Sequence, residues 1–253
     1  MDVSLRNKTA MVTTGSYDVS ALFNQEAASW QGNYGPKGKL NGRLERFTAR
    51  LSESCPPPAR ILDFGCGTGD IAAAMDRMGY QVTGCDIAEQ MIEIARRSHG
   101  GTPTKWICLR PDWEALPFGD CSFDGVVASS VFEYLVDVRR VTAELSRVLR
   151  PGGVLLLTVP NPFSLIRKLE AWLWTVVSSR LLAPLVHRVQ RIDSYATYLR
   201  LSRNRFQGNW WESVLSGAHF VGLEGSDFSD DAWLRQAKQA LFLLAVKRAA
   251  RDE

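Results

Sequence analysis

The chain has 253 residues, of which 45% are hydrophobic and 23% charged, and its formal net charge is +3. This length suits one large domain, or a domain with a cap, and allows a sizeable core. The charge balance gives no sign of a nucleic-acid partner, and the five cysteines contain no C-x-x-C pair of the kind that holds zinc. The composition therefore favours a globular domain with neither a nucleic-acid partner nor a metal.

The N-terminal part of the chain changes character near residue 17. Residues 1–16 are polar and aperiodic, which predicts a flexible arm, and they contain no apolar core for a signal peptide, so we expect a cytoplasmic protein. Residues 17–253 are predicted to form a single domain. Its first part, 17–55, carries two helical patterns of apolar residues and is predicted to form cap helices. Their Trp30, Tyr34 and Arg43 are candidates for a pocket wall.

The stretch ILDFGCGTGD, residues 61–70, predicts a strand, a glycine turn and the start of a helix. Glycine has no Cβ and adopts positive φ readily, so Gly65, Gly67 and Gly69 let the backbone pass close to a ligand. The helix that follows directs its free N–H groups at whatever lies in the turn. The pattern therefore predicts a ligand site at this turn without identifying the ligand.

Two acids narrow the choice of ligand. Asp63 lies just before the glycine turn, where a carboxylate repels a pyrophosphate but suits a cationic amino or sulfonium group. Asp86 closes the predicted second strand, which is the position that holds ribose hydroxyls in nucleotide-binding α/β sheets. One acid for an amino-acid moiety and one for a ribose together point to S-adenosylmethionine.

Further motifs follow in order: Asp112 ahead of Leu-Pro-Phe at 116–118, then FDGVVASSVFEYL from residue 123, then LRPGG from residue 149. With D-x-G-C-G-x-G at Asp63, this set resembles the class I S-adenosylmethionine-dependent methyltransferases of the small-molecule type, and is similar to the ubiquinone-pathway enzymes over about residues 58–160. The resemblance implies an α/β fold with a seven-stranded doubly wound sheet in the order 3-2-1-4-5-7-6, the last strand antiparallel. N-terminal helices and a helical lid inserted after strand 5, at residues 161–207, complete this expected fold.

The resemblance also implies residues for the cofactor, whose product would be S-adenosylhomocysteine. In the family the acid matched by Asp112 accepts a hydrogen bond from the adenine amino group, and the next residue packs near the ring. Trp113 stands where a small residue often occurs, so it either stacks on adenine or points outward. The expected cofactor-binding residues are Asp63, Gly65, Cys66, Gly67, Gly69, Asp86, Ile87, Met91, Asp112, Trp113 and Ser129.

The acceptor is expected beside the segment after the fourth strand, because ligands of such sheets bind at the carboxyl ends of strands. Glu133 is either a base or a turn cap. Tyr134 stands where the ubiquinone-pathway enzymes carry a histidine, so a metal or acid/base role is not copied from them. The expected acceptor-binding residues are Trp30, Tyr34, Ser130, Phe132, Tyr134, Trp172 and Tyr198.

Residues 161–207 combine an apolar helical stripe with a basic, aromatic segment. We expect an acceptor lid, with a dimer surface or an added packing layer as alternatives, so the chain is a monomer or a homodimer. The apolar run at 171–179 is far short of the roughly 20 residues of a membrane span. A Trp-containing helix flanked by arginines can still lie in an interface, so 165–190 is a candidate for peripheral membrane contact.

Methyl transfer from a sulfonium releases a neutral sulfide, so the protein mainly aligns the acceptor and excludes water. Candidates for a catalytic proton acceptor are His187, Glu133 and Tyr195. The expected function is transfer of a methyl group to an oxygen or nitrogen of a small molecule, such as a secondary metabolite, quinone precursor or lipid-like compound. The alternatives are an enzyme of the same fold with other S-adenosylmethionine chemistry, and a non-catalytic binding protein.

Overall fold

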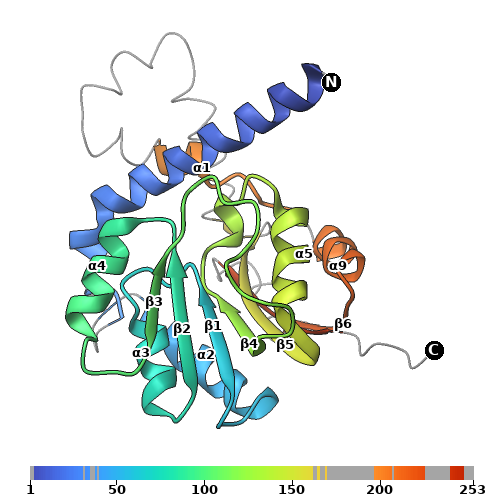
Figure 1. The fold of residues 1–253 in the computed structure, drawn as a ribbon. Helices are drawn as coiled ribbons and strands as arrows, with labels where there is room; N and C mark the ends of the chain where they lie inside the picture. The colour runs from blue at the N-terminus through green and yellow to red at the C-terminus, as the bar shows by residue number, and fades with distance from the viewer. Residues whose placement is uncertain are drawn as a thin grey trace.

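A sheet with helices on both faces forms the centre of the computed structural model (Figure 1), which describes residues 3–30, 32–34, 38, 40–161, 164–165, 169, 197–206, 208–225 and 240–247. The strands are β1 (Arg60–Phe64), β2 (Gln81–Asp86), β3 (Lys105–Cys108), β4 (Phe123–Ala128), β5 (Leu149–Pro160), β6 (Phe220–Gly225) and β7 (Ala240–Lys247).

The seven strands lie in the order β3-β2-β1-β4-β5-β7-β6. Strands β1 to β5 pair in parallel, whereas β7 is antiparallel to both β5 and β6. Parallel strands need helical crossovers that cover both faces of the sheet, which explains their nearly continuous apolar sequences. The α/β class with a parallel sheet is therefore confirmed.

Alternate residues of a strand point to opposite faces, and each face has its own apolar cluster. On one face α2 (Asn41–Ser54) and α3 (Asp70–Arg77) pack with Ile61 of β1. On the other, α5 (Val138–Val148) and α9 (Gly208–Gly217) pack with its neighbour Leu62. The two clusters bury β1 and β4 on both sides and thereby fix where these strands end.

The longest described helix, α1 (Val3–Trp30), crosses the molecule over the carboxyl ends of the parallel strands (Figure 1) and packs against α4 (Glu89–Ser98). Ser20 Oγ donates a hydrogen bond to the carbonyl of Ile87 at 2.9 Å, and Asn24 Oδ1 accepts one from the Gln90 amide at 2.9 Å. These bonds fasten α1 to the connection between β2 and α4.

The flexible arm predicted at residues 1–16, and with it the start of the cap helices at residue 17, is wrong, because α1 already begins at Val3. Residues 3–30 contain no proline, and a helix extends readily from a packed segment once it has been nucleated. Gly15 alone has low helix propensity, and a Cβ there would lie 3.0 Å from Val136 Cγ2. Its small size thus lets α1 approach the loop after β4.

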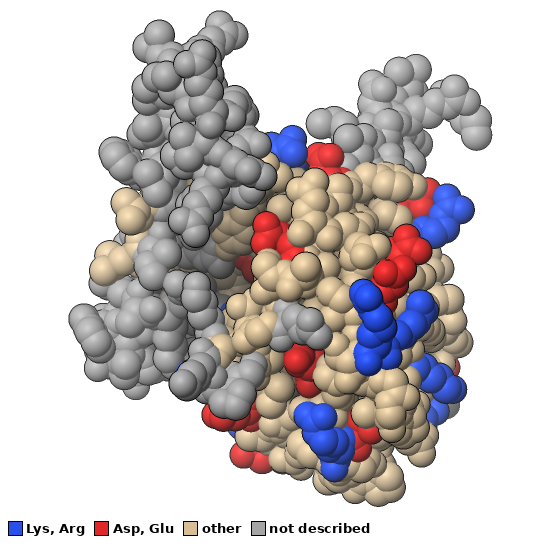
Figure 2. Space-filling model, turned by 90° about the vertical axis from the view of Figure 1, so that its left-hand side faces the viewer, with Lys and Arg blue, Asp and Glu red and all other residues tan. Residues whose placement is uncertain are grey.

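The predicted lid at 161–207 lies mostly outside the described residues, so the lid stays a prediction. Its described end includes a short helical turn at 197–201. Among the described helices, none has the length and apolar character needed to cross a membrane. On the described part of the face in Figure 2, acidic and basic side chains are both spread among uncharged ones.

An ion-pair cluster joins the amino-terminal ends of three neighbouring strands, β1, β4 and β5. Asp124 of β4 accepts hydrogen bonds from Arg60 Nε of β1 at 3.1 Å and from Arg150 Nε of β5 at 2.8 Å. It also accepts one from the Arg60 backbone amide at 2.8 Å. The bonds from Arg60 and Arg150 lower the pKa of Asp124 to about 2.

We predict that Asp124→Asn lowers the free energy of unfolding at pH 7 by about 1 kcal/mol, because it weakens charge-assisted bonds between strands. The stabilisation is present above the usual carboxyl pKa of about 4 and is lost as the pH falls towards 2. Urea unfolding at pH 7 and pH 3 measures the difference. Asp120→Asn, which removes an exposed partner of Arg147, serves as control, and an equal loss in both variants would contradict the account.

Candidate functional site

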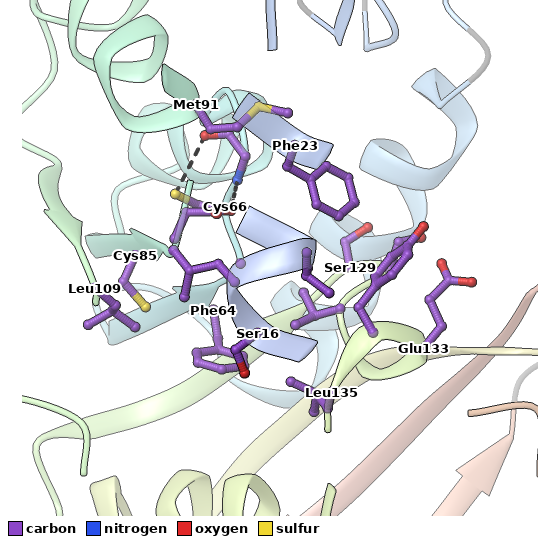
Figure 3. A pocket seen from close by; sticks show the side chains of 18 of the residues that line it. Ser16, Phe23, Phe64, Cys66, Cys85, Met91, Leu109, Ser129, Glu133 and Leu135 are labelled. Atoms are coloured by element: carbon purple, nitrogen blue, oxygen red, sulfur yellow. Dashed lines mark hydrogen bonds between the residues drawn. The ribbon is translucent and has the colours of Figure 1, made fainter. Parts of the chain in front are cut away.

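A cavity of about 250 Å³ lies between α1 and the carboxyl ends of the parallel strands. In the close view of Figure 3, Ser16 and Phe23 of α1 and the strand-end residues Phe64, Cys85 and Ser129 surround one space. The cavity thus occupies the position where ligands of parallel α/β sheets bind.

The three glycines of the turn after β1 all have positive φ, but they serve different purposes. A Cβ on Gly65 would lie 2.3 Å from Val131 Cγ2, and one on Gly69 would lie 2.5 Å from the Trp106 ring, so these two permit close packing within the protein. A Cβ on Gly67 would lie 3.7 Å from Trp30 Nε1 and 4.0 Å from Met91 Sδ. A Cβ on Gly67 would thus make only ordinary van der Waals contacts with the protein, and because Gly67 lines the cavity, its missing side chain leaves room for a ligand.

Asp86, at the end of β2, holds this turn in place. Its Oδ2 accepts a hydrogen bond from the Gly67 amide at 2.9 Å, and its Oδ1 accepts one from the Ala88 amide at 2.8 Å. Burial raises the pKa of Asp86, and the two amides oppose that shift. Each carboxylate oxygen keeps a further lone pair, so Asp86 can also accept from ligand hydroxyls in the cavity.

Asp63 lies beneath the turn and is 1% exposed, without lining the cavity. Burial, followed by the nearby Asp86 carboxylate, raises the pKa of Asp63 to about 7. Its Oδ2 is buried and has no hydrogen-bond partner in the part of the chain that the structure describes. Within the described residues, neither of these two neighbouring acids forms an ion pair, and a ligand carrying a sulfonium and an ammonium group would supply positive charge beside them. The site therefore fits S-adenosylmethionine.

Two cysteine thiols lie beside this turn. Cys66 and Cys85 line the cavity, and burial raises the pKa of both thiols well above its usual value. They remain protonated at neutral pH and contribute small packing surfaces instead of nucleophiles.

The segment after β3 also reaches the cavity, where Trp113 lines it together with Pro111. The Trp113 ring packs edge-on against Phe64 with the ring centres 6.0 Å apart, and the Arg140 guanidinium lies 4.5 Å from its ring centre. Asp112 does not line the cavity, because Arg110 holds its carboxylate in a two-pronged pair at 3.0 Å. The structure therefore brings the predicted aromatic residue to the site, but not the predicted acid.

The predicted cofactor residues divide accordingly. Asp63, Gly69 and Asp112 lie outside the cavity, whereas those lining it are Gly65, Cys66, Gly67, Asp86, Ile87, Met91, Trp113 and Ser129.

The other half of the cavity is aromatic and includes most of the predicted acceptor residues. Its lining includes Trp30, Tyr34, Ser130, Tyr134 and Tyr198. Burial raises the pKa of Tyr34, so its phenol stays protonated at neutral pH and can donate a hydrogen bond. Ser130 has a φ of +57°, a conformation that non-glycine residues seldom adopt and that is found mostly at functional sites.

Phe132 was predicted to bind the acceptor, and this is wrong. It is fully buried in the core and packs against Trp211 with the ring centres 5.9 Å apart. The 3₁₀ turn η1 (Phe132–Tyr134) directs Phe132 inward while its neighbours Glu133 and Tyr134 reach the cavity. Trp172, His187 and Tyr195 lie outside the described residues.

Glu133 lines the cavity, yet its carboxylate is engaged in a contact with the chain itself. Its Oε2 accepts a hydrogen bond from Ser202 Oγ at 3.0 Å, and its backbone carbonyl accepts one from the Arg203 amide at 3.0 Å. Asn204 reinforces the same junction by donating to the carbonyls of Phe132 and Leu135 at 2.8 and 2.7 Å. Glu133 thus fastens the described end of the predicted lid to the end of β4.

Three residues of α1 reach the cavity without having been predicted to do so, namely Ser16, Val19 and Phe23. Phe23 belonged to a predicted helix and carried the apolar spacing of one, so a contact with the sheet was foreseeable. Ser16 was assigned to the arm, and only the continuation of α1 through residue 16 brings it here.

Comparison with known proteins agrees with this geometry. A family model described as a methyltransferase domain matches residues 62–157. The ubiquinone biosynthesis O-methyltransferase of Xanthomonas oryzae pv. oryzae is 31% identical over 192 residues, which cover 72% of this chain and 76% of that protein. The biotin biosynthesis bifunctional protein BioHC of Cellvibrio japonicus is 32% identical over 155 residues, which are 61% of this chain but 29% of the relative.

A similar fold occurs in phosphoethanolamine N-methyltransferase 2 of Haemonchus contortus, whose structure contains S-adenosyl-L-methionine. The TM-score is 0.60 at 18% identity, with 89% of this chain and 57% of that chain covered. The glycine turn, the two buried acids and the relatives agree, and S-adenosylmethionine is the cofactor. The chain belongs to the class I S-adenosylmethionine-dependent methyltransferases.

Proposed function

We propose that this chain transfers the methyl group of S-adenosylmethionine to an oxygen or nitrogen of a small molecule bound in the aromatic half of the cavity. One observation carries the proposal: the same cavity is lined by the glycine turn with Asp86 and by the aromatic residues Trp30, Tyr34 and Tyr198. A bound cofactor and an acceptor would therefore lie next to each other, which is the main requirement of an in-line displacement.

The names of relatives favour oxygen as the methylated atom. The Xanthomonas relative is named an O-methyltransferase of ubiquinone biosynthesis, and a malonyl-[acyl-carrier protein] O-methyltransferase of Erwinia pyrifoliae is 32% identical over 164 residues.

When bound, the cofactor supplies an electrophilic methyl group on a positively charged sulfur. The chain contributes binding and charge balance: Gly67 leaves room beside the turn, Asp86 is placed to accept from hydroxyls, and buried Asp63 compensates positive charge. Residues of α1 line the cavity, and water that they and the bound reactants displace would strengthen these electrostatic interactions.

A dedicated base is not needed for this chemistry if the acceptor atom is already unprotonated. Glu133, a predicted candidate, accepts a hydrogen bond from Ser202 and serves to hold the chain. Tyr34 stays protonated. Among the described residues, no histidine lines the cavity, so we propose that the chain acts mainly by aligning an acceptor that ionises readily.

A direct test incubates the protein with methyl-labelled S-adenosylmethionine and a panel of phenols, catechols, hydroxy acids and amines. We expect label to appear in at least one panel compound, with formation of an equal amount of S-adenosylhomocysteine. Cleavage of the cofactor without labelled acceptor would instead favour other chemistry on the same fold.

We predict that Gly67→Ala weakens S-adenosylmethionine binding by about tenfold or more, because the added methyl group enters the cavity at a positive φ of +54°. Isothermal titration calorimetry measures the change. Gly152→Ala is the matched control, since Gly152 also has a positive φ, +72°, but lies away from the cavity. In Gly152→Ala the added methyl group strains the backbone away from the cavity and should leave S-adenosylmethionine binding unchanged. Equal losses of binding in both variants would contradict a cofactor site at Gly67.

The buried acids predict how binding depends on pH. Asp63 is protonated below its pKa of about 7, so a cationic ligand must displace a proton there, whereas above pH 7 the carboxylate is already charged. We predict that S-adenosylmethionine affinity rises between pH 6 and pH 8. It should rise less for S-adenosylhomocysteine, which lacks the sulfonium charge, and the dependence should flatten in Asp63→Asn. The same pH slope for both ligands would contradict a role for the sulfonium charge.

A further inference from the structure

Two aromatic rings of the acceptor half come from segments that are far apart in the sequence. Tyr134 belongs to η1, after the end of β4, and Tyr198 to the helical turn at 197–201. Both residues line the cavity, and their ring centres lie 6.2 Å apart at an interplanar angle of 64°. Phe23 of α1 packs edge-on against Tyr134 with the ring centres 5.0 Å apart. The shape of this aromatic wall therefore depends on how the turn at 197–201 is held against η1.

The side chain of Glu133 connects the two segments. Glu133 precedes Tyr134, is 6% exposed, and accepts a hydrogen bond at Oε2 from Ser202 Oγ at 3.0 Å. Ser202 follows Tyr198 by one helical turn, and the Ser202 amide donates to the Tyr198 carbonyl at 2.9 Å. One buried hydrogen bond thus joins the neighbour of the first ring to the turn that carries the second.

Other contacts hold the segment that contains this turn. The backbone carbonyl of Glu133 accepts a hydrogen bond from the Arg203 amide at 3.0 Å. Leu201 is 2% exposed and belongs to an apolar cluster with residues of α1. These contacts fix the segment as a whole, whereas the bond between Glu133 and Ser202 acts on the turn that bears Tyr198.

A proton acceptor and a positioning residue place different demands on the Glu133 side chain. A base needs a group that can take a proton at neutral pH, which the amide of a glutamine is not. Holding Ser202 needs only an oxygen that accepts a hydrogen bond, and a glutamine supplies one. The observed bond to Ser202 meets the second demand. The two roles therefore predict opposite results for Glu133→Gln.

We propose that Glu133 is a positioning residue, which through Ser202 sets the spacing between Tyr134 and Tyr198 and thereby determines which acceptors the cavity holds in line with the methyl group. The proposal rests on the proposed function and assigns acceptor selection at that site to one hydrogen bond. Alignment is sensitive to such spacing, because the reacting atoms must lie about 3–3.5 Å apart. Loss of the bond should weaken acceptor binding and leave cofactor binding at the glycine turn and Asp86 unchanged.

The first test observes Tyr198 directly and needs no acceptor. Labelling with 3-fluorotyrosine marks the six tyrosines of the chain, and fluorine NMR spectra are recorded with S-adenosylhomocysteine bound. We expect the Tyr198 resonance, assigned with Tyr198→Phe, to shift or broaden in Glu133→Ala and Ser202→Ala but to stay close to its wild-type position in Glu133→Gln. Tyr80 lies away from the cavity and donates to the Cys55 carbonyl at 2.9 Å, so its unchanged resonance reports an intact fold.

The second test measures kinetics with methyl-labelled S-adenosylmethionine and the panel compound that takes up most label. Glu133→Ala and Ser202→Ala should each raise the acceptor KM by about tenfold, as expected for loss of a buried hydrogen bond. The double variant should lose no more than either single variant, because all three lack the same bond. Glu133→Gln should lose much less, and S-adenosylhomocysteine affinity should stay at the wild-type value throughout. Ser216→Ala, which removes an exposed hydroxyl bonded within α9, is the matched control.

An unchanged Tyr198 resonance in Ser202→Ala, or additive losses in the double variant, would overturn the proposal. Equal losses in Glu133→Gln and Glu133→Ala beside a normal Ser202→Ala would overturn it in favour of a proton-accepting Glu133. If the wild type binds S-adenosylhomocysteine and the Tyr198 resonance responds as expected, but no panel compound takes up label, the failure lies with the proposed function and not with the positioning of Tyr198.

Discussion

The hydrogen bond from the Gly67 amide to Asp86 is the interaction on which the site depends. It joins the turn after β1 to the end of β2, and it places a carboxylate beside backbone that has no side chain. Asp63 lies below the same turn, so two acids share a buried region, and burial together with Asp86 raises the pKa of Asp63 to about 7. The arrangement costs free energy unless positive charge enters, and it thereby selects a cationic cofactor.

The second half of the cavity is built by elements outside the parallel sheet. α1 contributes Phe23 and Trp30, α2 contributes Arg43, and the described end of the predicted lid contributes Tyr198. Glu133 and Asn204 tie that segment to the end of β4, next to the cavity. The glycine turn and Asp86 of the cavity thus come from the sheet, whereas much of its aromatic lining comes from the helices and from the segment anchored at Glu133.

The sequence predicted the parts of the fold that local chemistry dictates. Glycines before a helix and acids at strand ends are the pattern of a ligand site, so Gly67 and Asp86 were assigned to a ligand before any geometry was known, although Gly65 and Gly69 of the same turn serve packing. The inward turn of Phe132 and the capture of Asp112 by Arg110 depend on rotations and pairings that a residue pattern does not contain. The length of α1 was missed because its first residues carry no apolar periodicity, and a helix can still extend through them from a packed end.

The most direct measurement of the central claim is titration of wild type and Asp86→Ala with S-adenosylmethionine by calorimetry, with circular dichroism to check that both are folded. The account predicts one saturable site in wild type and a loss of affinity of about tenfold or more in Asp86→Ala, because the carboxylate both shapes the turn and faces the cavity. A folded wild-type protein that does not bind, or an Asp86→Ala variant that binds as tightly as wild type, would contradict it.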